Sequence, residues 1–167
     1  MALADDPLEI RERDERAVAW LYGSVLTAPA VAVAADIKAL DAAQVFSYTA
    51  ATMTVIWLAH AFSEFVGHGG RVDLPKLGGR VWHAMRTELP VLVSACPTLI
   101  ALAACWLLGA TVETAGNVGL AVSVTVLVLV AAGAAQRSGA APLAIAETAG
   151  TALVLGGLIV VAKISLG

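Results

Sequence analysis

The chain has 167 residues, of which 59% are hydrophobic and only 14% are charged, and its mean hydropathy is +0.85. A soluble domain carries about 25% charged residues, and a water-exposed surface this poor in charge would leave apolar patches that aggregate. The composition therefore excludes a soluble enzyme, a disordered chain and a secreted disulfide scaffold. The net charge of −3 also argues against a nucleic-acid partner, which requires a basic surface.

The charged residues are separated by long apolar stretches that indicate membrane spans. A helix needs about 20 apolar residues to cross a hydrocarbon core roughly 30 Å thick. Such stretches occur at residues 17–35, 44–66, 89–110, 114–136 and 139–166. Continuous apolar runs differ from the alternating pattern of β-barrel strands. The sequence therefore predicts an all-α transmembrane helical bundle with about five spanning helices.

The positions of Lys and Arg predict how the bundle is oriented. With a cytoplasmic N-terminus, eight of the ten Lys and Arg residues lie in cytoplasmic segments, as the positive-inside rule requires. We therefore expect a charged cytoplasmic segment at 1–16 and a single bundle at 17–167 with a cytoplasmic insert at 67–88. Because the prefix of the first span is acidic and further spans follow, we expect that span to be retained. The predicted location is the cell membrane, with multiple passes.

Three ionisable side chains near the inner end of the second span are the first candidates for function, because ionisable groups are costly inside a membrane. His60, Glu64 and His68 recur every four residues and so share one helix face. Such a row could relay protons, since histidine exchanges protons near neutral pH, or contribute to a metal site, since imidazole and carboxylate bind divalent ions. His60 and His68 lie about 12 Å apart along the axis, too far to bind one ion. Whether a metal binds is therefore left unknown.

Other spans place polar groups at the depth of His60, counted from their cytoplasmic ends. The sequence thus predicts an inward-facing polar site, with ion or proton pathway residues His60, Glu64 and Glu147 and secondary candidates His68, Tyr22 and Pro97. The alternative is structural: His60 and Glu147 hydrogen-bond and lock two helices together.

Two further features are expected to be structural or local. Pro97 inside a helix frees the carbonyl group of Val93, which favours a hinge or a ligand there. Glu113 lies near the outer interface, and Lys163 is long enough to reach that interface, so both are expected to be anchors.

Several short segments resemble a known family. The runs Leu21–Gly23, Trp57–His60 with Glu64, and Gly157–Val160 with Lys163 resemble an uncharacterised family of multispanning integral membrane proteins of actinobacteria. This resemblance extends from Arg16 onward and implies a small multispanning protein, without an activity. More distantly, five spans with an insert after the second are similar in architecture to vacuolar iron transporter-like proteins. Residues 17–35 contain no Asp or Glu and so lack the acidic ligands of that family's first span.

Two functions follow from these patterns. The first is a small ion, proton or metal transporter with a polar inward-facing site. The alternative is a non-transporting accessory or scaffold subunit of a membrane complex. We expect no enzyme, because no nucleophile–base constellation or HExxH motif is present, and no cofactor is implied. The expected partners are the lipid bilayer and a homo-oligomer or larger membrane complex, because glycines in the fourth and fifth spans favour close helix contacts.

Overall fold

The computed structural model describes residues 7–37, 40–67 and 77–166, and within these ranges it contains helices and connections without strands. In chain order the helices are α1 (Pro7–Asp36), α2 (Ala42–Gly67), α3 (Leu77–Thr87), α4 (Leu89–Val93), α5 (Cys96–Leu107), α6 (Val112–Arg137) and α7 (Pro142–Leu166). The predicted all-α bundle is confirmed.

Five helical stretches are long and apolar enough to cross a membrane, and they coincide with the five predicted spans. They run over Val18–Asp36, Ala42–Gly67, Leu89–Leu107, Val112–Arg137 and Pro142–Val161. The third comprises two helices, α4 and α5, and the first continues without a break from the charged segment that begins at Pro7. Proline suits this first helical position because its missing N–H would have no partner there. The chain therefore has the architecture of a polytopic membrane protein.

Local capping explains where several helices begin and end. Before α2, the Asp41 carboxylate accepts from the Gln44 amide at 2.8 Å, and the Gln44 side chain accepts from the Asp41 amide at 2.9 Å, which is a reciprocal capping box. The Thr111 hydroxyl caps α6 by accepting from the Thr114 amide at 3.2 Å. Gly109 and Gly139 follow α5 and α6 with φ of 69° and 72°, a conformation that favours glycine at a helix end.

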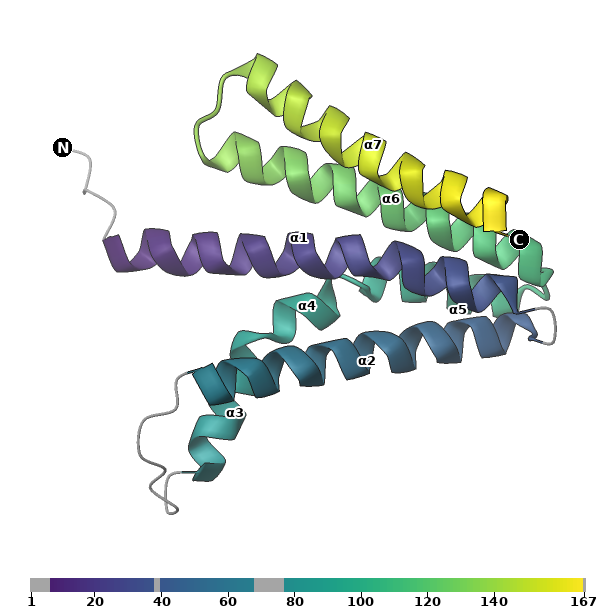
Figure 1. The fold of residues 1–167 in the computed structure, drawn as a ribbon, viewed down its shortest axis with the longest axis horizontal. Coiled ribbons are helices and arrows are strands. Elements are labelled where there is room, and N and C mark those ends of the chain that lie inside the picture. The colour runs from purple at the N-terminus through teal and green to yellow at the C-terminus, as the bar shows by residue number, and fades with distance from the viewer. Residues whose placement is uncertain (1–6, 38–39, 68–76, 167) are drawn as a thin grey trace.

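Helix α1 runs through the middle of the bundle. It packs against α6 and α7 on one side and against α2 and α4 on the other (Figure 1). The helices converge where α1 ends and α2 and α6 begin, and they spread apart towards the opposite end, where α2 ends and α7 begins (Figure 1). We call these the convergent end and the spread end.

Small residues allow the close packing at the convergent end. A Cβ atom on Gly119 of α6 would lie 2.9 Å from side-chain atoms of both Val31 and Leu102, and one on Gly116 would lie 2.6 Å from the Ala35 Cβ. Small residues let helix backbones approach closely. This packing stabilises helix association inside lipid, where the hydrophobic effect does not drive it. The core cluster here consists of Ala28, Val31, Ala32, Ala34, Ala42, Val45, Leu102, Cys105, Ala115 and Leu120.

The third span is broken inside the bundle. Helix α4 ends at Val93, α5 begins at Cys96, and each helix has a proline in its first turn, where a missing N–H costs nothing. At the break, the Ser94 hydroxyl donates to the Val91 carbonyl at 2.7 Å. Here α4 meets α1 so closely that a Cβ on Gly23 would overlap the Ser94 hydroxyl and the Val91 carbonyl. Glycine at position 23 therefore allows the two backbones to touch.

Replacing Gly23 by alanine tests this contact. Because the added methyl group overlaps backbone as well as a side chain, we expect Gly23→Ala to lower the free energy of unfolding by about 1–3 kcal/mol. The measurement is thermal unfolding of the purified protein in detergent micelles. Gly150→Ala on α7 is the matched control, since nothing lies within 4 Å of its added Cβ. A Gly23→Ala protein as stable as the Gly150→Ala protein would contradict the contact.

Candidate functional site

Titratable side chains from three parts of the fold meet on the side of the bundle towards the spread end. His60 of α2 places its Nδ1 atom 3.6 Å from Oε2 of Glu88, the residue between α3 and α4. The Tyr22 ring of α1 lies 4.5 Å from the His60 ring, centroid to centroid, at an interplanar angle of 58°. The His60 and Glu88 side chains are 35% and 17% exposed. Both side chains are therefore half-buried, and His60 is the more exposed of the two.

The return of α3 onto α2 brings Glu88 to this position. The Trp57 indole Nε1 of α2 donates to the Met85 carbonyl of α3 at 3.2 Å. The Arg80 guanidinium lies 5.6 Å from the centroid of the Phe65 ring, within the range of a cation–π contact. Glu88 then caps α4 without a side-chain capping bond, so its carboxyl group is not committed to the helix end.

The surroundings of Glu88, which directly precedes the third span, favour its protonated form. Burial raises the pKa of the Glu88 carboxyl above its ordinary value, His60 lowers it, and Glu64 raises it; burial is the largest effect. A carboxyl group with a raised pKa beside an imidazole can hold a proton and pass it on. Tyr22, whose ring packs on His60, and Glu64, whose charge acts on Glu88, also lie near the pair.

The structure brings some of the predicted residues together and separates others. Tyr22 contacts His60, and Glu64 lies one turn further along α2 and acts on Glu88. Glu147 is exposed on α7, which packs on the opposite side of α1 from α2 (Figure 1). Glu147 therefore does not approach His60. Pro97 lies in the first turn of α5, next to the break in the third span, and His68 lies outside the described residues.

Sequence reasoning missed Glu88 as the partner of His60. The sequence feature that could have identified Glu88 is its position directly before the third span. The second span ends and the third begins on the same side of the membrane, so residues near those two ends occupy similar depths. Fifth-span Glu147 satisfied the depth criterion equally well, and depth alone does not tell which helices are neighbours.

Hydroxyl groups make up the buried polar side chains among the residues whose burial is described: Ser24, Thr27, Thr49, Ser94, Thr98 and Ser123. Thr98 of α5 and Ser123 of α6 are hydrogen-bonded to each other at 3.0 Å. The Oγ1 atom of Thr49 has no hydrogen-bond partner among the described groups. The buried interior in this set is thus mainly apolar, with scattered hydroxyl groups and no buried charge.

The described side chains do not form a metal centre. Among the side chains that the structure describes, within 18–37, 40–67 and 78–165, no group of three His, Cys, Asp or Glu residues is arranged to hold a metal ion. Comparison with models of known protein families, with curated proteins and with solved structures found no match.

The raised pKa of Glu88 predicts a pH dependence of stability. Because the folded state holds the Glu88 proton more tightly than the unfolded state, the stabilisation is complete below the ordinary value of 4.5 and is lost as pH rises through the higher folded pKa. The difference in unfolding free energy between the unsubstituted protein and Glu88→Gln should therefore shrink as pH rises. Thermal unfolding in detergent over a pH series measures it.

The control for this pH series is Glu147→Gln, which removes an exposed carboxylate from α7. This variant shows what replacing a carboxylate by an amide does at a position away from His60. If the Glu88→Gln difference grew with rising pH, the Glu88 carboxylate would instead be stabilised by His60, and the assigned effect of burial would be wrong.

Proposed function

We propose that this membrane protein carries protons, or couples proton movement to transport of a small ion, through a site formed by His60 and Glu88. The observation that carries the proposal is the 3.6 Å approach of the His60 imidazole to the Glu88 carboxyl group in a half-buried position. Ionisable side chains at membrane depth are costly to keep and mark proton relays in membrane proteins.

The shape of the bundle supports an inward-facing site. The helices spread apart towards the end where α2 ends and α7 begins (Figure 1), which is the cytoplasmic end under the proposed orientation. At the convergent end, apolar side chains such as Val31, Leu102 and Leu120 pack together. Helices that diverge at one end of a bundle and pack tightly at the other resemble a carrier in one of its two states.

Between these ends, hydroxyl groups supply the polar surface that a proton path needs. The Ser94 hydroxyl lies at the break in the third span, beside Gly23 of α1. Thr98 follows four residues later and meets Ser123. Hydroxyl groups both donate and accept hydrogen bonds and therefore support relays through ordered water.

Proton flux in proteoliposomes tests the proposal. The full chain is reconstituted with a pH-sensitive dye inside the vesicles, and a potassium diffusion potential drives protons. We expect flux above that of protein-free vesicles, and a loss of about tenfold or more in His60→Ala and in Glu88→Gln, because each substitution removes one of the two groups proposed to exchange the proton. His83→Ala, which removes an exposed imidazole from α3, is the matched control and should keep the flux.

Glu147→Gln distinguishes the two possible carboxylate partners of His60. Because Glu147 is exposed on α7, its substitution should leave the flux intact. Loss of flux in Glu147→Gln with normal flux in Glu88→Gln would move the pathway to α7. Flux equal to that of protein-free vesicles, with or without added inorganic ions on one side of the membrane, would overturn the transport proposal.

A second candidate function, an accessory or scaffold subunit, is favoured by the exposure of α7. Of the five spans, α7 has the smallest buried share. Glu147, Gly150, Val154 and Gly157 are all exposed on it and share one helix face. Such a face is suited to another membrane helix. If the protein is an accessory subunit, the purified chain should carry no proton flux. Gly157→Leu should then release the partner helix and lower the mass of the complex extracted from native membranes.

A further inference from the structure

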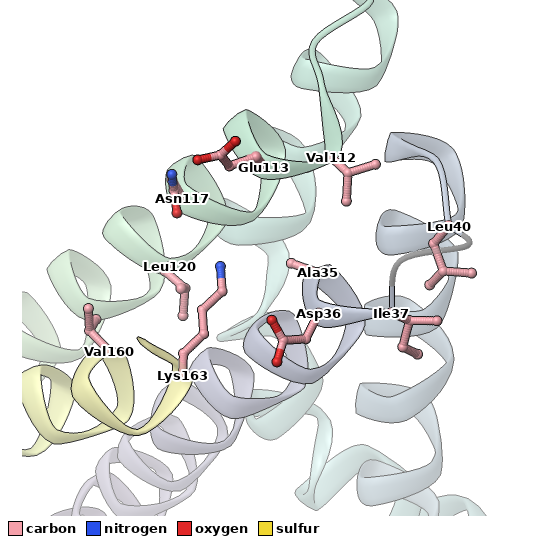
Figure 2. A pocket seen from close by; sticks show the side chains of 10 residues that line it. All are labelled: Ala35, Asp36, Ile37, Leu40, Val112, Glu113, Asn117, Leu120, Val160 and Lys163. Atoms are coloured by element: carbon pink, nitrogen blue, oxygen red, sulfur yellow. The ribbon is translucent and has the colours of Figure 1, made fainter. Parts of the chain in front are cut away.

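A cleft at the convergent end, away from the His60–Glu88 pair, is lined by residues of both charge signs. Its volume is about 510 Å³, and it lies between the end of α1, the start of α6 and the last turns of α7 (Figure 2). Its polar lining is Asp36, Glu113, Asn117 and Lys163, and its apolar lining includes Leu120 and Val160. The first span ends and the fourth span begins at this level, which is where lipid headgroups meet the hydrocarbon core.

The Lys163 side chain crosses the cleft instead of extending along its own helix. It reaches from α7 towards α6, with Asp36 on one side and Asn117 and Glu113 on the other (Figure 2). Its Nζ atom lies 3.4 Å from where a Cβ of Gly116 would be, so glycine at that position leaves room for the ammonium group. Lys163, which the sequence predicts to be an anchor at the outer interface, thus also lines this cleft.

The charged side chains that line the cleft are not paired with one another. Within the part of the chain that the structure describes, no ion pair joins Lys163 to Asp36 or to Glu113. Opposite charges attract more strongly near a low-dielectric wall than in water, yet these groups are held apart on three different helices. A ligand that places an anionic group on Lys163 and a cationic group on the carboxylates would satisfy both at once.

We propose that this cleft binds a phosphoethanolamine group, with its phosphate on Lys163 and its primary ammonium on Asp36 and Glu113. The cleft is lined by two carboxylates, of Asp36 and Glu113, and one ammonium group, of Lys163, so its lining is net negative. A zwitterionic ligand is therefore favoured over an anionic headgroup, which this lining would repel. The primary ammonium can donate hydrogen bonds to carboxylates and to the Asn117 amide oxygen, whereas a choline group has no N–H to donate. Leu120 and Val160 provide an apolar surface for the glycerol end of the ligand.

This chemistry has two sources, and the experiment has an arm for each. The membrane source is phosphatidylethanolamine, and the soluble source is glycerophosphoethanolamine. In the first arm, the full chain is reconstituted in phosphatidylglycerol nanodiscs with small, equal amounts of phosphatidylethanolamine and phosphatidylcholine, re-extracted, and its retained lipids are counted by mass spectrometry. In the second arm, glycerophosphoethanolamine is titrated calorimetrically into the detergent-solubilised protein.

We expect phosphatidylethanolamine to be enriched over phosphatidylcholine by about tenfold, the effect of one charge-assisted hydrogen bond. Lys163→Gln and Asp36→Asn should each abolish the enrichment. Arg137→Gln, which removes an exposed cation at the other end of α6, should retain it and is the matched control. Because the two test variants remove opposite charges from different helices, a folding defect in one leaves the other as an independent test.

Each outcome decides the proposal. Enrichment that both variants lose supports a lipid ligand. Binding of glycerophosphoethanolamine without lipid enrichment, again lost in both variants, supports a soluble ligand. Equal retention of the two zwitterionic lipids with no binding of the soluble compound, or enrichment unchanged by Lys163→Gln, overturns the proposal and leaves these side chains as interfacial anchors.

Discussion

The site depends on one close contact, between the backbone of α1 at Gly23 and α4 at Val91 and Ser94. Because the third span is broken, α4 can lean on α1 while α5 packs against α6 and α2. The start of α4 then fixes Glu88 beside His60 of α2. A side chain at position 23 would push α4 away from α1, so the geometry of the titratable cluster follows from a glycine that itself carries no chemistry.

The number and limits of the spans could be predicted from the sequence because lipid imposes a simple rule. Backbone groups in the hydrocarbon core must be paired within helices, and charges must lie outside it, so charge-free stretches coincide with helices such as Val112–Arg137. The break at Ser94 was only partly foreseen. Pro97 indicated a point where the helix could break. Its place in the first turn of α5 depends on the packing of α4 against α1, which no local sequence pattern records.

The candidate site was predicted in part. Periodicity placed His60 and Glu64 on one helix face, and depth placed Tyr22 at the level of His60; the structure has Tyr22 against His60. Depth could not decide between carboxylates on different helices. Glu147 is exposed on α7, whereas Glu88 reaches His60 because Trp57 holds α3 against α2. Likewise, Lys163 and Glu113 were expected at the outer interface, but the cleft that they share with Asp36 arises only when three helix ends converge.

Proximity of positions 60 and 88 is the central claim, and cross-linking in native membranes tests it directly. In a chain whose Cys96 and Cys105 are replaced by alanine, His60→Cys is combined with Glu88→Cys or with Glu147→Cys. The two proteins are then treated with a short bifunctional thiol reagent and analysed by mass spectrometry. The account predicts an intramolecular cross-link for the 60/88 pair and none for the 60/147 pair. A cross-link for 60/147 with none for 60/88 would contradict it.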